Sequence, residues 1–213
     1  MSPSLALEVE TARLDHLVVD VLVTPFFACD RPLRGPAARA DWRLCGRLSD
    51  HLQREDLTGE RGEAALFPTG GRLRAPLLMA VGLGPRSEFK EETLRLVARC
   101  ATEKLLGLHS GIAGIALPGK AVSHLETDRS AALVLEGVAA VLSERPSALR
   151  LRLSVTPEDA ALARAGLWEA ARRLSSSDLA IQFDRSSAAL PQRRGSAAFE
   201  LGLPAGTTAP RGR

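Results

Sequence analysis

The chain has 213 residues, of which 45% are hydrophobic, 25% charged and 4% aromatic, which excludes the disordered, collagen-like and fibrous classes. Lys and Arg outnumber Asp and Glu by 28 to 25, giving a net charge of +3. Residues 185–213 contain five arginines and one glutamate, so this end carries +4 and the preceding residues sum to −1. A body without excess positive charge argues against nucleic-acid binding through the folded part.

Several residue types and sequence motifs are absent, and each absence excludes a class of reaction, modification or location. The sequence contains no Tyr and no Asn, so it has neither a tyrosine acid nor an N-glycosylation site. Its three cysteines (Cys29, Cys45 and Cys100) are far apart and form no C-x-x-C pair, which favours buried, reduced thiols. The N-terminus lacks a basic region, and no apolar run approaches the roughly 18 residues of a membrane span. These features predict a soluble, cytoplasmic protein without membrane association.

Strands and helices are predicted to alternate in the first half of the chain. Residues 5–10 alternate as a half-buried strand does, and 17–25 are nearly all apolar, as in a central strand covered on both faces. A helix is predicted over 38–54, with Trp42 assigned to the core together with the leucines that share its helical spacing. Two adjacent strands are predicted at 62–68 and 75–84, joined by a turn at Gly70–Gly71.

The second half continues the alternation. Helices are predicted over 88–107 and 126–144, and strands over 112–117 and 149–155. Thr156 and Pro157 predict the start of a last helix that ends near Leu174. Such an alternation predicts a layered α/β fold with a largely parallel sheet in a domain spanning 1–183. Residues 184–213, rich in Arg, Ala, Pro and Gly, are predicted to form a flexible tail.

Known catalytic and phosphate-binding motifs occur only in incomplete form. Gly114 to Lys120 has the spacing of a phosphate loop, but Ala121 replaces the required Ser or Thr. Gly82 to Ser87 resembles a dinucleotide fingerprint without its third glycine. The four histidines lack metal-ligand spacing, and no nucleophile elbow is present. The sequence therefore predicts no catalytic residue, no metal and no cofactor.

Two long segments resemble the leucyl (cytosol) aminopeptidase family. They are VLVTPFFACDRPLRGPAARADWRLCGRLS (21–49) and TGERGEAALFPTGGRLRAPLLMAVGLGPRSEFKEETLR (58–95). In that family a Gly-Glu strand, a hairpin, an apolar strand and a Gly-Leu-Gly turn follow one another in this order. The similarity is collinear over about residues 8–174 and covers only the family's N-terminal domain. It implies a three-layer, macro-domain-like α/β fold whose mixed, mostly parallel sheet is flanked by helices.

The resemblance does not extend to the family's catalytic half. That half carries the carboxylates and lysine that bind two metals, together with an N-T-D-x-x-G-R stretch, which a sequence without Asn cannot contain. None of the family's catalytic residues transfers to a position of this chain. The resemblance therefore implies a protein that is not an enzyme and shows no peptidase activity.

The macro-like fold also implies a possible ligand site for ADP-ribose or a related nucleotide. Thr24 and Phe27 stand where macro domains often carry asparagines, and two loops correspond to the glycine-rich phosphate loops. Each loop keeps only one glycine, which leaves little room for the close approach of backbone amides to a pyrophosphate. Phe26 and Phe27 are also compatible with a filled sheet end that leaves no pocket. The candidate ligand-binding residues are Thr24, Arg34, Gly35, Gly119, Lys120 and Ser123.

Three functions stay open at this point. The first is a stand-alone, non-catalytic homologue of the aminopeptidase N-terminal domain, acting as an interaction, assembly or regulatory module. Its partner would be a second copy of itself or a full-length aminopeptidase. The second is a degenerate macro-type binder of ADP-ribose or a related nucleotide. The third is contact with nucleic acid through the arginine-containing tail, which the neutral body disfavours.

Overall fold

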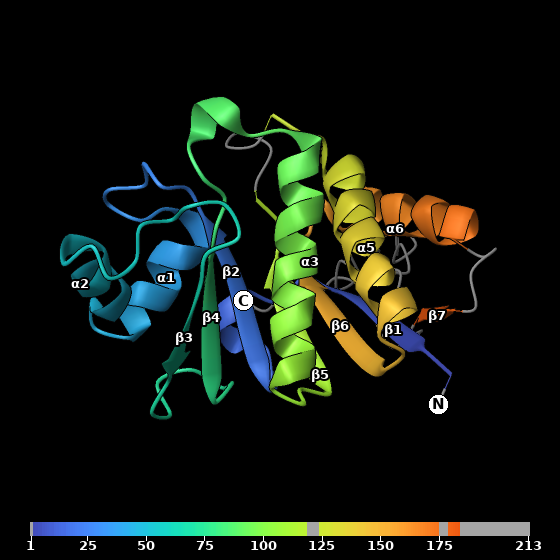
Figure 1. Ribbon diagram of the computed structural model, residues 1–213, viewed down its shortest axis with the longest axis horizontal. Coiled ribbons are helices and arrows are strands. Elements are labelled where there is room, and N and C mark those ends of the chain that lie inside the picture. Colours follow the sequence, from blue (N-terminus) through green and yellow to red (C-terminus); the bar gives the residue numbers. More distant parts are fainter. Residues whose placement is uncertain (1, 119–123, 175–178, 184–213) are drawn as a thin grey trace, which may run out of the picture.

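Seven strands form one sheet in the order β3-β4-β2-β5-β6-β1-β7. The computed structural model describes residues 2–118, 124–174 and 179–183, and it confirms the predicted α/β fold with a sheet flanked by helices (Figure 1). All neighbouring strands are parallel except β3 and β4. The strands are β1 (Ser4–Glu10), β2 (Val21–Phe26), β3 (Ala64–Pro68), β4 (Leu77–Gly82), β5 (Ile112–Ala116), β6 (Ala148–Ser154) and β7 (Ala180–Phe183). The predicted tail, 184–213, lies outside the described residues.

The helices cover the two faces of this sheet unequally. Helices α3 (Glu91–Gly107), α5 (Thr127–Glu144) and α6 (Ala160–Leu174) pack side by side on one face (Figure 1). The shorter helices α1 (Gly35–Arg43) and α2 (Arg47–Gln53) belong to a second apolar cluster on the other face. Strand β2 serves both clusters, because Val21 and Val23 face one and Leu22 the other. Its predicted central position is thereby confirmed. Within the described part of the chain, no helix is long and apolar enough to span a membrane.

The single helix predicted over 38–54 is wrong. The chain breaks after α1, where Cys45 and Gly46 take left-handed conformations with φ of 58° and 83°. The Asp41 carboxylate then accepts hydrogen bonds from the backbone amides of Leu48 and Ser49, at 2.8 and 3.2 Å, and so satisfies the start of α2. An acidic side chain before the break thus fixes a turn that apolar periodicity alone does not reveal.

Two side-chain assignments also need correction. Trp42 is 75% exposed and is not part of the core. Cys29 and Cys45 are exposed rather than buried, and Cys100 is half-buried. Cys29 follows the end of β2 and Cys45 lies in the α1–α2 turn, so neither side chain is drawn into an apolar layer. Burial raises the pKa of the Cys100 thiol, and the nearby Glu103 carboxylate raises it further.

The last predicted helix begins later than expected. Thr156 to Asp159 form a turn, and α6 starts at Ala160 with the Asp159 carbonyl accepting the Ala163 amide at 2.9 Å. After α6, the short strand β7 was missed by the sequence reading, since four residues without strong alternation give little signal. It pairs in parallel with β1. The remaining predicted strands and helices are confirmed within a few residues at their ends.

The Gly82-Leu-Gly turn has a packing role. A Cβ atom at Gly82 would lie 2.1 Å from the Glu60 carbonyl oxygen and 2.5 Å from the Gly59 carbonyl carbon, so only glycine fits beneath the 59–63 turn. That turn is held by the Glu63 carboxylate, which accepts hydrogen bonds from Thr58, Gly59 and Glu60. Burial raises the pKa of Glu63, but these bonds outweigh it and leave the pKa below its ordinary value.

Candidate ligand-binding pocket at the carboxyl edge of the sheet

A cavity of about 470 Å³ opens where several parallel strands end. Its wall residues stand at or just after the carboxyl ends of four strands: Phe26 for β2, Ala116 for β5, Ser154 for β6 and Thr11 for β1. Ligands of α/β proteins bind outside this edge, because successive strands deliver their following loops to the same place. The volume lies in the range of roughly 300–1,000 Å³ that is usual for small-molecule pockets.

The amino-terminal ends of three helices contribute to the same cavity. Gly35, the first residue of α1, and Thr127, the first residue of α5, both line it. Asp159, which precedes α6, lines it as well. Free backbone amides and the helix dipole give each such end a partial positive charge. The pocket is therefore surrounded by positive potential from the backbone before any side chain is counted.

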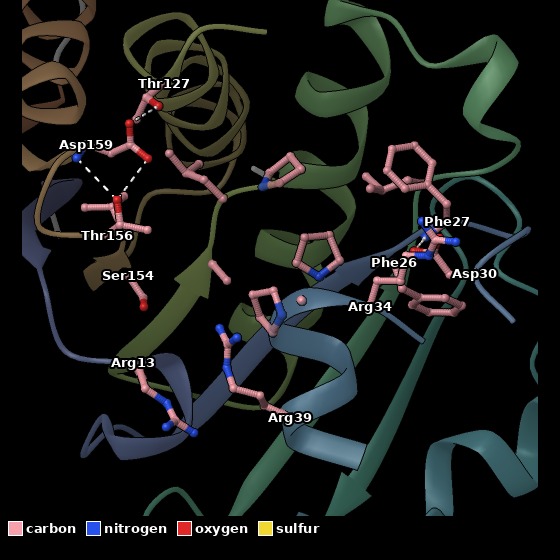
Figure 2. Close-up of a pocket in the computed structure, with 18 of the residues that line it drawn as sticks. Arg13, Phe26, Phe27, Asp30, Arg34, Arg39, Thr127, Ser154, Thr156 and Asp159 are labelled. Atoms are coloured by element: carbon pink, nitrogen blue, oxygen red, sulfur yellow. Dashed lines mark hydrogen bonds between the residues drawn. The ribbon is translucent and has the colours of Figure 1, made fainter. Parts of the chain in front are cut away.

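Three arginines line the cavity at separate points of its wall (Figure 2). Arg34 and Arg39 line the cavity, are exposed, and have no ion-pair partner among the residues that the structure describes. Arg13 also lines it and donates two hydrogen bonds to Asp15, at 3.1 and 2.9 Å. Arg43 shares the same carboxylate at 3.4 Å. The cavity can bind an anion through the guanidinium groups of Arg34 and Arg39, which no described carboxylate neutralises.

The Asp15 carboxylate keeps Arg13 in place. Its side chain is only 2% exposed. Burial raises the pKa of Asp15, but hydrogen bonding and charge from Arg13 outweigh burial, and the pKa lies below its ordinary value. The carboxylate therefore stays ionised at neutral pH and fixes Arg13 at the rim of the pocket.

The wall formed after β6 and at the start of α5 combines hydroxyl groups with a carboxylate (Figure 2). Thr127 Oγ1 donates to Asp159 Oδ1 at 3.0 Å, and Thr156 Oγ1 lies 3.1 Å from Asp159 Oδ2. The Ser154 hydroxyl, on the same wall, donates to the Ala12 carbonyl at 2.9 Å. These contacts tie the start of α5 to the start of α6.

The phenylalanines fill the end of β2 without closing the pocket. Phe26 and Phe27 are 2% and 1% exposed. Phe27 packs edge-to-face on Phe89, with ring centroids 5.3 Å apart, and the Arg86 guanidinium stands 4.5 Å from its ring centre. Arg86 also pairs with Asp30 at 2.7 Å. Both rings lie along the cavity wall, so the prediction that they occupy the sheet end is right, and a pocket nevertheless opens beside them.

The predicted ligand-binding residues separate into three groups. Arg34 and Gly35 line the cavity. Thr24 is fully buried and does not line it, and its hydroxyl oxygen has no hydrogen-bond partner within the described structure. Gly119, Lys120 and Ser123 lie outside the described residues.

The sequence did not point to several polar residues of the cavity wall, among them Arg13, Arg39, Thr127 and Asp159. Thr127 and Asp159 follow the helix-start signals that the sequence does contain. Their convergence depends on the strand order, which brings the ends of β5 and β6 together. No local motif marks Arg13 or Arg39. Across the described ranges, no group of three His, Cys, Asp or Glu side chains is arranged to hold a metal ion.

Comparison with known sequences gives a consistent family match. The model of the cytosol aminopeptidase family, N-terminal domain, matches residues 23–143. A probable cytosol aminopeptidase from Streptomyces griseus is 36% identical over 132 residues, which cover 60% of this chain and 23% of that protein. The corresponding protein from Sulfurihydrogenibium is 31% identical over 88 residues, covering 41% and 18%. The chain thus spans at most about a quarter of the curated relatives it matches.

Solved structures match the fold at low sequence identity. The Oceanobacillus iheyensis macrodomain with ADP has a TM-score of 0.65 and 14% identity, covering 78% of this chain and 92% of that one. A mutant of tomato leucine aminopeptidase has a TM-score of 0.65 and 17% identity, covering 82% and 37%. These neighbours confirm the expected macro-domain-like architecture.

Proposed function

The chain belongs to the cytosol aminopeptidase family by its N-terminal domain, and from this premise we propose a non-catalytic binding module whose pocket holds a phosphate-bearing small molecule of the ADP-ribose class. The observation that carries the proposal is the presence of two exposed arginines without ion pairs, Arg34 and Arg39, on the wall of the cavity that also holds the positive end of α1. Guanidinium groups and helix amino-termini are the usual partners of phosphate in proteins. Much of the remaining wall is apolar and can pack against a base or a sugar face.

The backbone at Gly35 is compatible with such a ligand. Gly35 has a positive φ of 57°, and a Cβ atom there would meet no atom within 4 Å. Gly35 lines the cavity, and a glycine there adopts its positive φ without strain and lets a phosphate approach the backbone closely. The macrodomain with ADP, named above, lends support through its shared fold. A cytoplasmic location is part of the proposal and follows from the family resemblance.

Thermal unfolding with ADP-ribose tests this function. A ligand present at 100 times its dissociation constant adds about 2.7 kcal/mol to the stability of the folded state. For a chain of this length we expect Tm to rise by roughly 5–10 °C, measured by calorimetry on the full chain. Unchanged Tm at millimolar ADP-ribose, with no heat of binding in titration calorimetry, would exclude the nucleotide function.

A second candidate function is assembly through a surface separate from the pocket. Trp42 is 75% exposed, with the Arg43 guanidinium 5.5 Å from its ring centre. Exposed tryptophan and arginine side chains are enriched at protein interfaces. The expected partner is a second copy of the chain or a full-length aminopeptidase.

Sedimentation tests the assembly candidate. We expect the chain to self-associate at micromolar concentration, and Trp42→Ala to shift it towards monomer. Trp168→Ala is the matched control, because Trp168 is 59% exposed but packs on Phe183 at 5.4 Å. A chain that sediments as a monomer at every concentration, alone and when mixed with a full-length cytosol aminopeptidase, contradicts this candidate.

A further inference from the structure

The cavity wall carries carboxylates as well as arginines, and an unpaired carboxylate limits which ligands can bind. Asp30 and Asp159 are the two carboxylates among its described lining residues. Asp30 is neutralised, since it pairs with Arg86 at 2.7 Å and accepts the Phe27 amide at 3.3 Å. Asp159 has no ion-pair partner among the described residues and accepts hydrogen bonds only from neutral hydroxyl groups. Its negative charge is therefore not balanced by a side-chain cation.

The Asp159 side chain is held in place by hydrogen bonds, but its carboxylate can accept more of them. Its backbone carbonyl begins α6, and its two carboxylate oxygens contact Thr127 and Thr156. An ionised carboxylate offers about four acceptor positions, so acceptor capacity remains after these two contacts. The side chain is half-buried and lies on the cavity wall. A ligand that excludes water from this wall must supply donors to the carboxylate or leave it undersolvated.

Arg34 and Arg39 on the one hand and Asp159 on the other thus select different parts of one ligand. A phosphate group is attracted by Arg34 and Arg39 and repelled by Asp159. We propose that Asp159 is a specificity-determining residue that requires hydroxyl or amine donors on the ligand, at the end away from its phosphate groups. The inference rests on the proposed function, because it concerns the same pocket.

Paired probes separate donor recognition from general effects on anion binding. ADP-ribose carries phosphates, hydroxyls and an amine, whereas inorganic pyrophosphate carries phosphates alone. In Asp159→Asn we expect ADP-ribose affinity to fall about tenfold or more, as for loss of a charge-assisted hydrogen bond. Pyrophosphate affinity is expected to stay equal or to rise, because a repelling charge is removed. Titration calorimetry is therefore expected to show a loss of affinity for ADP-ribose and no loss for pyrophosphate.

Matched nucleotides identify the donor. If the donor is the adenine amine, wild type binds ADP more tightly than IDP, and this difference disappears in Asp159→Asn. If it is a ribose hydroxyl, the difference between ADP and 2′-deoxy-ADP disappears instead. Either result supports the inference.

Two further variants control for loss of the fold and for a general change of charge. Asp159→Ser removes the carboxylate while keeping a side chain that can begin a helix. Asp128→Asn makes the same change of charge in the first turn of α5, at a residue that does not line the cavity, and is expected to leave the ADP-ribose to pyrophosphate preference unchanged.

The outcomes are distinguishable. Wild type that binds neither probe overturns the proposed function and this inference together. Wild type that binds both, with Asp159→Asn and Asp159→Ser changing both affinities by the same factor, overturns the inference alone and leaves the anion site standing.

Discussion

Replacing Arg34 and Arg39 together by alanine is expected to lower the affinity for ADP-ribose by about a hundredfold or more. Each guanidinium is expected to form a charge-assisted hydrogen bond with a phosphate group, and such bonds contribute about 1.5–3 kcal/mol each. Neither residue has an ion pair in the described structure, so their removal breaks no internal contact of that kind. The unfolding temperature without ligand should stay close to that of wild type. Titration calorimetry with ADP-ribose measures the effect.

A double change elsewhere on the surface provides the comparison. Arg54 and Arg74 are exposed and do not line the pocket, and alanine at both removes the same total charge. Affinity in this control is expected to fall less than about threefold, since exposed charges at a distance are screened by salt. Equal losses in the two double variants would mean that ADP-ribose senses only the overall charge, and the pocket would lose its role.

Gly166→Ala is expected to destabilise the fold by about 3 kcal/mol or more. A Cβ atom at Gly166 would stand 2.0 Å from the Asp128 carbonyl oxygen and 2.7 Å from its Cα. These are backbone atoms, so relief requires α5 and α6 to move apart. For a chain of this size the loss corresponds to a fall in Tm of roughly 6–12 °C, measured by calorimetry. Movement of α5 would also displace Thr127, so weaker ADP-ribose binding is expected in the same variant.

Gly107→Ala provides the matched control for Gly166→Ala. Gly107 also belongs to a helix, but a Cβ atom there would meet nothing within 4 Å. Alanine restricts the unfolded chain more than glycine does, so a neutral effect or a gain below about 1 kcal/mol is expected. If both variants lose the same stability, the close approach of α5 and α6 at Gly166 is not the cause of the loss.

Hydrophobic pattern predicted most of the fold because burial in this protein follows local periodicity. Every second residue of β6 is buried, namely Leu149, Leu151 and Leu153. A period of two can be recognised in the sequence without knowledge of the tertiary structure. The break between α1 and α2 could not be predicted from periodicity, because it depends on the Asp41 carboxylate, which accepts a hydrogen bond from the backbone amide of Leu48. Trp42 was misassigned for a related reason. Its large apolar ring suggested burial, whereas the inward face of α1 is formed by the small residues Ala37 and Ala40.

The candidate site was predictable only where it lies close to a known loop. Arg34 and Gly35 were found through the family resemblance, which marks the segment before α1. Thr24 was misplaced because an alternating strand sends one residue to the pocket edge and its neighbour into the core. Arg13 and Asp159 are far apart in sequence, and both reach the wall of one cavity through the order of β1, β6 and the loops that follow them. Such long-range convergence has no local signature.

Strand β1 has a consequence for how the chain is made. It is synthesised before the other described strands, yet its two neighbours in the sheet, β6 and β7, are the last strands of the described chain. At roughly 5–20 residues per second, the ribosome needs on the order of ten seconds to produce β6 after β1. During that interval Leu5, Leu7 and Val9 have no strand to pair with. The nascent chain therefore presents an unpaired, leucine-bearing strand, and such a strand is prone to aggregate until its neighbours have been made.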